Sequence, residues 1–112
     1  MRRCELWWVD LGDPVGSSPG YERPSVIVSS DRFNYSKLNT VIVVPLYSNL
    51  DYAQHAGNVL LAALVTGLDR DSVANVTQVG AVDRQQLLRL VGIVPPSLMA
   101  QLDSGIRLVL GL

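Results

Sequence analysis

Two runs of β-branched and aliphatic residues, PSVIVSS at 24–30 and TVIVVPLYS at 40–48, constrain the fold more than any other feature of this sequence. Neither run alternates apolar with polar residues, and this continuous apolar character is typical of short strands that are buried on both faces. We therefore expect both runs to be central strands. Pro45 has no N–H to donate to a neighbouring strand, so the second strand must either bulge there or leave that edge unpaired, and we expect it to bend.

Three further segments are interpreted as strands. CELWWVDL at 4–11 alternates its side chains between two faces, whereas 57–64 and 71–83 are largely apolar and are separated by the turn-like TGLDRD. By composition, 57–64 is equally compatible with a helix. Between the first two strands, GDPVGSSPGYE at 12–22 contains three glycines and two prolines, which resist both helix and central strand. A loop of this length is often a lid or a binding edge, so it is a candidate site.

The last part of the chain predicts two helices with a strand between them. DRQQLLRL at 83–90 opens with an aspartate in position to cap a short helix, and VGIV at 91–94 is strand-like. After Pro95 and Pro96, apolar residues recur at intervals of four, four and three, on one stripe of a helix. The stripe consists of Leu98, Leu102, Ile106 and Val109. Gly105 weakens this helix by about 1 kcal/mol relative to alanine, so the helix depends on packing against the rest of the domain.

Size and composition indicate a small, mostly antiparallel β-barrel or curled sheet with a C-terminal helix, a single domain over residues 1–112. Hydrophobic residues make up 48% of the chain and charged residues only 17%, so apolar surface is in surplus and we expect a homodimer. The formal net charge of -1 gives no general attraction to nucleic acid. Any binding of RNA or DNA therefore requires cations gathered locally.

The counts of cysteine and histidine exclude some classes of site. A single cysteine and a single histidine cannot form an intrachain disulfide or a Cys/His zinc site, so we expect no metal and no cofactor. This cysteine usage fits a cytoplasmic protein. Glu5 and Asp10 interrupt the N-terminal apolar stretch, so we expect no secretory signal, and no run approaches the length of a membrane span.

Five motifs follow one another along the chain: RCELWWVDL, GSSPGYERPSVIVSSD, VVPLYSN, GLDRDSVANVTQVGAVD and VGIVPPSLMAQLDSGIRLVLGL. In order and spacing they resemble, over nearly the whole chain, the MazF/PemK family of toxins from bacterial toxin–antitoxin systems. The resemblance implies a small SH3-like antiparallel barrel with attached helices that forms a homodimer. It also implies a metal-independent, sequence-specific endoribonuclease that cleaves single-stranded RNA and leaves a 2′,3′-cyclic phosphate and a 5′-hydroxyl.

The resemblance implies a second partner, a cognate antitoxin whose acidic, disordered tail lies in the groove of the toxin dimer and competes with RNA. Candidates for a basic lining of this groove are Arg2, Arg3, Arg23, Arg32 and Arg84. Two other functions stay open, because a fold does not settle a function. One is a CcdB-like toxin that binds gyrase and cleaves nothing, and the other is a family member whose catalysis is impaired.

Arg23 is the main candidate for catalysis. When an RNA 2′-hydroxyl attacks the adjacent phosphodiester, negative charge builds up on the phosphoryl oxygens, and a planar guanidinium can bind two of them at once. Pro24 fixes the start of the strand, so Arg23 is carried on a rigid edge. From the residues alone, the alternative is a surface ion pair with Glu22 or Asp31. The resemblance implies a catalytic arginine at this position.

Tyr47 and Ser48 are the candidates for a catalytic hydroxyl. The resemblance implies a threonine near the arginine that holds the phosphate, and Tyr47 occupies that position here, which retunes or abolishes the activity. Adjacent strand residues point to opposite faces, so Ser48 replaces the hydroxyl only if a bulge at Pro45 shifts the register. Otherwise both residues belong to an ordinary strand end.

Four residues are candidates for binding RNA. Ser17 and Ser18 lie in the long loop, where the resemblance implies a glutamate after GS; the general base is therefore unassigned, and Glu22 is either its substitute or a solvated carboxylate. His55 has an ordinary pKa near neutrality, so it is either an acid or base in the reaction or an exposed loop residue. Gln78 matches a glutamine of the family, and its amide can bind a base edge or support the catalytic arginine.

Trp7 and Trp8 are neighbours on the first expected strand. Aromatic rings of this kind stack on bases in proteins that bind single-stranded nucleic acid. Because alternate strand residues face opposite sides, at least one of the two belongs to the core, and we assign neither to RNA.

Overall fold

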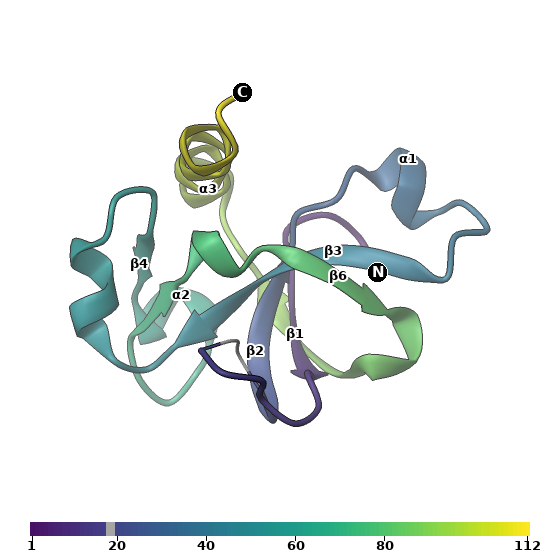
Figure 1. Ribbon diagram of the computed structural model, residues 1–112, viewed down its shortest axis with the longest axis horizontal. Helices are drawn as coiled ribbons and strands as arrows, with labels where there is room; N and C mark the ends of the chain where they lie inside the picture. Colours follow the sequence, from purple (N-terminus) through teal and green to yellow (C-terminus); the bar gives the residue numbers. More distant parts are fainter. Residues whose placement is uncertain (18–19) are drawn as a thin grey trace.

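The computed structural model describes residues 1–17 and 20–112 (Figure 1). Within these ranges the strands are β1 (Glu5–Asp10), β2 (Glu22–Ile27), β3 (Thr40–Tyr47), β4 (Val59–Leu61), β5 (Ser72–Ala74), β6 (Gly80–Asp83) and β7 (Leu87–Ile93). The helices are α1 (Asp31–Asn34), α2 (Ala63–Thr66) and α3 (Pro96–Leu110), and the 3-10 turns are η1 (Leu50–Gln54), η2 (Val76–Gln78) and η3 (Arg84–Gln86). The strands form one curled antiparallel sheet with the order β4-β5-β3-β2-β1-β7, and β6 pairs with β3. The predicted antiparallel sheet with a C-terminal helix is confirmed. In the described ranges no helix is long and apolar enough to cross a membrane.

The sheet is built on β3, which pairs with neighbours along both of its edges. One edge pairs with β2, and the other pairs first with β6 and then with β5. Pro45 lies where this second edge changes partner, and its carbonyl accepts a hydrogen bond from the N–H of Asn75 (3.0 Å). Because the N and C=O of a strand residue point to the same side, the N–H that proline lacks falls where no ladder bond is required.

The two alternatives for Pro45 are thereby separated. The ladder between β2 and β3 runs without a shift, with Ser25 opposite Pro45 and Val26 opposite Val44, so the predicted bulge is not found there. The other alternative holds only locally: β6 pairs with β3 up to Val43 and β5 from Leu46, so neither ladder requires an N–H from Pro45. Irregular register occurs instead between β1 and β7, on both sides of the Trp7–Trp8 pair. Residues after Pro45 therefore keep the ordinary alternation of a strand.

An apolar cluster is buried on each face of the sheet. The larger includes Leu6 and Val44 together with residues of α3, which lies over that face (Figure 1), and the smaller includes Val9 and Val43. The side chains of successive strand residues, such as Val43 and Val44 of β3, belong to different clusters. The continuous apolar runs of β2 and β3 follow from this arrangement, because both faces of these strands are covered.

The predicted stripe of α3 packs against the larger cluster. Leu102 is fully buried and Met99, which the stripe did not include, is buried beside it. Gly105 faces Gly57, and a Cβ at Gly105 would overlap the Gly57 carbonyl. The glycine that lowers the helix propensity is therefore required by the close approach of the loop before β4.

Three of the expected segments differ from the structure. The stretch 57–64 is neither one strand nor one helix, because β4 is followed directly by α2. The stretch 71–83 is divided into β5, η2 and β6. The helix expected over 83–90 is wrong: Asp83 does cap a turn, but only the 3-10 turn η3, and the chain from Leu87 onward pairs with β1 as β7. Pairing with a neighbouring strand overrides the local helical signal there.

Candidate functional site

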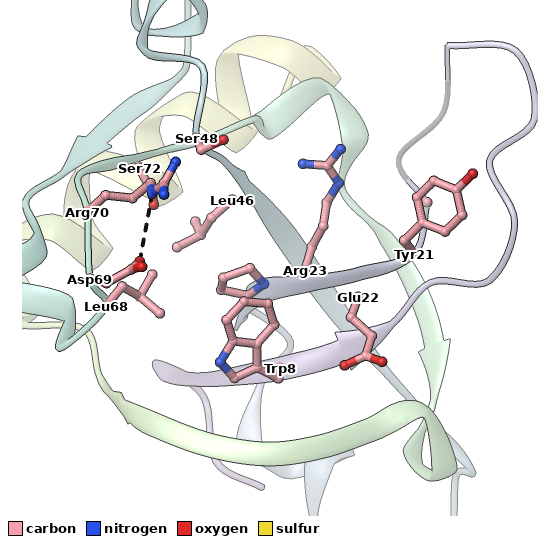
Figure 2. Close-up of a pocket in the computed structure, with 12 residues that line it drawn as sticks. Trp8, Tyr21, Glu22, Arg23, Leu46, Ser48, Leu68, Asp69, Arg70 and Ser72 are labelled. Carbon is pink, nitrogen blue, oxygen red and sulfur yellow. Dashed lines mark ion pairs between the residues drawn. The ribbon is translucent and has the colours of Figure 1, made fainter.

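A cavity of about 400 Å³ opens where the start of β2 meets the end of β3 (Figure 2). Its apolar lining comes from Trp8, Pro24, Leu46 and Leu68, and polar side chains at its border include Arg23, Ser48, Asp69 and Arg70. Three strands and the turn at 68–72 therefore contribute to one concavity, although they are far apart in the sequence. A cavity with apolar walls and a few polar groups is the ordinary form of a ligand site.

Arg23 is held by the ring of Tyr47. The register that places Ser25 opposite Pro45 brings Arg23, two residues earlier on β2, beside Tyr47, two residues later on β3. The carbon of the guanidinium lies 4.3 Å from the centroid of the Tyr47 ring, a cation–π contact. Tyr47 itself is only 8% exposed, so the ring is a fixed support.

The guanidinium of Arg23 has donors to spare. Its Nε is buried and has no hydrogen-bond partner among the described residues, and Arg23 forms no ion pair within them. The alternative of a surface pair is therefore not found. The Asp31 carboxylate instead accepts from the N–H of Arg3 (2.7 Å) and from Asn34 (3.1 Å), and Figure 2 shows the Glu22 carboxylate turned away from the guanidinium. An unpaired, partly buried cation favours an anion at this position.

A row of rings continues from Tyr47 into the turn that follows β3. The Tyr47 and Tyr52 centroids lie 4.8 Å apart, and those of Tyr52 and His55 lie 5.3 Å apart in an edge-on arrangement. Tyr52 and the backbone of His55 belong to η1 and its cap. His55 is exposed, as expected for a loop residue, but its ring is oriented by the ring of Tyr52. Tyr52 lies only three residues before His55 in the sequence, whereas the link from these rings to Arg23 passes through Tyr47 of β3 and follows only from the fold.

Ser48 borders the same cavity as Arg23, from the end of β3. Leu46 and Ser48 line the cavity whereas Tyr47, between them, does not, which is the alternation of an undistorted strand. Figure 2 shows the Ser48 side chain and the guanidinium at the same end of the cavity. The register shift on which the expected role of Ser48 depended is thus absent, but Ser48 still borders the cavity that Arg23 lines, whereas Tyr47 contacts Arg23 through its ring.

The other RNA-binding candidates are not gathered at this cavity. Ser17 is exposed and is not part of its lining, and Ser18 lies outside the described residues. Gln78 lines a second, smaller cavity of about 240 Å³ with Leu11 and Pro45, and Arg23 is not among the residues there.

Most of the other predicted cations serve the fold. Arg84 donates to the carbonyls of Leu38 (2.7 Å) and Asn34 (2.6 Å), and Arg3 donates to Asp103 and to the Val28 carbonyl. Arg2 lies beside Glu5, and Arg32 lies over the Phe33 ring. These four arginines are therefore occupied within their own surroundings.

Sequence reasoning missed one cation, one carboxylate and one aromatic residue at the border of the cavity, and a second arginine beside it. Arg70 and Asp69 border the cavity from the turn before β5, and Trp8 forms part of its wall. Arg89, opposite Trp8 on β7, places its guanidinium 5.5 Å from the Trp8 ring. The alternation of β1 indicated that one tryptophan faces away from the core, but only the sheet order reveals which residues lie beside it.

The resolved pKa shifts lie outside the cavity. Burial raises the pKa of Glu5, but hydrogen bonds from the Arg2 N–H and the Trp7 indole outweigh it, so this pKa is below its usual value. The N–H of Arg3, followed by the Asn34 amide, lowers the pKa of Asp31. Among the described residues, no group of three or more His, Cys, Asp or Glu side chains is arranged to hold a metal ion. The chemistry that this site offers is therefore binding of a phosphate by a guanidinium, beside an apolar cavity.

Known proteins resemble this chain over its full length. The profile described as PemK-like, MazF-like toxin of type II toxin–antitoxin system matches residues 2–110. Endoribonuclease MazF6 of Mycobacterium tuberculosis H37Rv is 46% identical over 112 residues, which cover 100% of this chain and 98% of that protein.

Solved structures show the same fold at low sequence identity. MazF from Deinococcus radiodurans aligns with a TM-score of 0.85 at 18% identity, over 100% of this chain and 97% of that one. An endoribonuclease from a mycobacterial species, in complex with its cognate antitoxin, aligns with a TM-score of 0.80 at 20% identity, over 100% and 96% of the two chains. The fold likeness and the family profile point to the same family. The chain belongs to the PemK-like, MazF-like family of toxins from type II toxin–antitoxin systems.

Proposed function

We propose that this chain is a toxin that cleaves single-stranded RNA as a metal-independent, sequence-specific endoribonuclease, with Arg23 as its phosphate-binding residue. Membership of the family over residues 2–110 and the 46% identical relative named an endoribonuclease support the activity. The observation that carries the proposal is the Arg23 guanidinium, which lies at the edge of an open cavity without an ion pair among the described residues.

In this proposal the RNA supplies its own nucleophile. The 2′-oxygen attacks the adjacent phosphorus and loses its proton, and the bond from phosphorus to the 5′-oxygen breaks as that oxygen takes up a proton. The products are a 2′,3′-cyclic phosphate and a 5′-hydroxyl. Arg23 binds two non-bridging oxygens and stabilises the charge that builds up on them. Of the side chains that line the cavity, Glu22 carries a carboxylate on the same strand as Arg23 that can accept the 2′-proton.

Ser48 and Tyr47 have different roles in this scheme. Ser48 is exposed at the cavity, so its hydroxyl donates to the phosphate from the side where the substrate enters. Tyr47 acts as a positioning residue, because its buried ring supports the guanidinium at 4.3 Å. The substitution of tyrosine for the threonine of the family pattern is then compatible with activity. His55 and Gln78 remain candidates for contacts to RNA beyond the scissile phosphate, together with the loop serines Ser17 and Ser18.

The proposed partners follow from the family. We infer a single toxin domain over residues 1–112 that acts as a cytoplasmic homodimer and is neutralised by a cognate antitoxin, whose acidic tail competes with RNA for Arg23. The solved mycobacterial endoribonuclease that contains its antitoxin supports this partner. The many exposed aliphatic side chains, Ile42, Leu88, Leu90 and Ile93 among them, support the homodimer.

The test is cleavage of a mixed-sequence single-stranded RNA by the purified protein in the presence of EDTA. We expect cleavage by the wild type, 2′,3′-cyclic phosphate ends on the products, and a loss of roughly 100-fold or more in Arg23→Ala. Arg107→Ala is the matched control, because Arg107 is an exposed arginine near the end of α3, away from the cavity.

Two results would contradict the proposal. Equal cleavage by wild type and Arg23→Ala would show that the guanidinium does not act on the phosphate. Absence of cleavage in EDTA that is restored by a divalent metal would show that the reaction is not the one described here.

A further inference from the structure

The cavity beside Arg23 has a wall suited to an aromatic ligand. Trp8 and Pro24 are opposite one another on β1 and β2, and Leu46 and Leu68 extend the same apolar surface. The Trp8 ring is held from the other side of β1 by Arg89, which is not among the residues that line the cavity. Figure 2 shows Trp8 and Leu46 between the Arg23 side and the Asp69–Arg70 side. A fixed indole at the wall of a cavity is a surface on which a base can stack.

The opposite border of the cavity carries a carboxylate that the fold does not use. Within residues 1–17 and 20–112, Asp69 pairs only with its neighbour Arg70, at 3.8 Å, and the two side chains are 86% and 69% exposed. A pair this exposed contributes little to stability, so either group can turn to a ligand at little cost. Asp71, two residues on, differs: it accepts from the N–H of Ala63 (2.8 Å) at the start of α2. The turn 68–72 thus contains one structural aspartate and one that is available.

The Trp8 indole also keeps a polar group available. Among the described residues, the Trp7 indole N–H donates to Glu5 (3.1 Å), whereas no hydrogen bond of the Trp8 indole is found. An indole N–H donates only, a carboxylate accepts only, and a guanidinium donates only. Besides its aromatic wall, the cavity therefore offers the Asp69 carboxylate as an acceptor and the Arg70 guanidinium and the Trp8 indole as donors.

We propose that this cavity holds one unstacked RNA base, adjacent to the phosphate bound by Arg23, and that Asp69 selects a base with an exocyclic amino group over uracil. This inference rests on the proposed function. Adenine, cytosine and guanine each present an amino group that can donate to the carboxylate, whereas uracil presents carbonyl oxygens on both sides of its one N–H, and these are repelled by it. Arg70 and the Trp8 indole donate to the acceptor atoms of the same base.

The first test compares cleavage-site preference in a randomised single-stranded RNA library, read from the cleaved ends. For wild type we expect one position next to the cleaved bond to exclude uracil. In Asp69→Asn the discrimination against uracil at that position falls by roughly 5- to 50-fold, since the amide can both donate and accept. Asp51→Asn is the matched control, because Asp51 is exposed on η1 and does not line the cavity.

The second test measures binding without cleavage. The chain has two tryptophans, so Trp7→Phe leaves Trp8 as the only indole. In that background we expect a short 2′-O-methyl RNA, which cannot supply the nucleophile, to quench Trp8 fluorescence on stacking. An oligomer of uridines should quench it with at least fivefold weaker affinity than an oligomer of cytidines, and Asp69→Asn should reduce this difference.

The outcomes separate the inference from the proposed function. If wild type cleaves RNA and Asp69→Asn leaves every positional preference unchanged, the base site is wrong and the endoribonuclease stands. If RNA binds without changing Trp8 fluorescence, the stacking wall is wrong. If wild type fails to cleave but Trp8 fluorescence responds to RNA with the expected preference, the proposed reaction fails while the base site is supported.

Discussion

Arg23 and Arg84 are both half-buried arginines, and the comparison of their surroundings shows what distinguishes a functional cation from a structural one. Arg84 closes the segment around α1: its guanidinium donates to the backbone carbonyls of Leu38, Asn34 and, at 3.4 Å, Phe33. Arg23 packs on a ring and has a buried Nε without a partner among the described residues. Because both side chains carry the same charge, the feature that distinguishes Arg23 from Arg84 is the number of N–H donors that the surrounding residues leave unpaired.

The largest effect that we expect is on the activity of Arg23→Lys. This change keeps the charge but removes the planar fork, so cleavage should fall about 100-fold while the thermal midpoint stays within a few degrees of wild type. Cleavage of a single-stranded RNA and a thermal scan measure the two quantities. If the lysine variant cleaves at the wild-type rate, charge alone is sufficient and the comparison with Arg84 loses its basis.

Arg84→Met should show the reverse behaviour. Loss of the hydrogen bonds to several carbonyls should lower the free energy of unfolding by about 2 kcal/mol, because these bonds involve a charged donor. Cleavage per folded molecule should be unchanged, since Arg84 does not line the cavity. Urea unfolding and the same cleavage assay check this. A loss of activity without a loss of stability would show instead that Arg84, like Arg23, has a role in cleavage.

Tyr47 separates a support for Arg23 from a catalytic hydroxyl. Tyr47→Phe keeps the ring, so we expect cleavage within about twofold of wild type, whereas Tyr47→Leu removes the cation–π contact and should lower it about fivefold to tenfold. The measurement is kcat and KM on one RNA substrate. If Tyr47→Phe is as impaired as a change of Arg23, the hydroxyl takes part in the reaction and the ring is not the main contribution.

The sequence predicts the strands that carry the site better than the site itself. The continuous apolar runs of β2 and β3 identify central strands, because strands buried on both faces contain few polar residues. Arg23, expected just before the first of these strands, lies at its second residue, since β2 begins at Glu22. Its partner on the sheet follows from register, which was uncertain as long as Pro45 allowed a bulge. Whether the N–H that Pro45 lacks is needed depends on which strands pair with that edge of β3. These are β6 and β5, which lie far along the chain.

The missed residues depend on contacts between distant segments. Trp8, Asp69 and Arg70 meet at the cavity only because the order β5-β3-β2-β1 places the turn after α2 above the start of β2. The residues LDRDS have the composition of an ordinary turn, and nothing in them indicates that one aspartate accepts from the Ala63 N–H at the start of α2 while the other is available. Local sequence patterns therefore predict helices and strands, whereas the different roles of similar residues, such as Asp69 and Asp71, become apparent only in the folded sheet.

The smallest effect concerns acid stability around α1, the region that Arg84 closes. The pKa of Asp31 is lowered because its carboxylate accepts from the Arg3 N–H and the Asn34 amide, so the folded protein binds this proton less readily than the unfolded chain does. Stability from this group is therefore present above the ordinary pKa of an aspartate and is lost as pH falls through the lower, folded value. Asp31→Asn cannot titrate, so between about pH 6 and pH 3 its urea midpoint should fall less than that of wild type.

Some acid dependence should remain in Asp31→Asn, because the pKa of Glu5 is also lowered, by hydrogen bonds that outweigh its burial. Asp51 is exposed, and its carboxylate has no hydrogen bond among the described residues. Asp51→Asn should therefore follow wild type across the same range. If Asp31→Asn and Asp51→Asn show the same slope, the Asp31 carboxylate does not carry the acid dependence of this region.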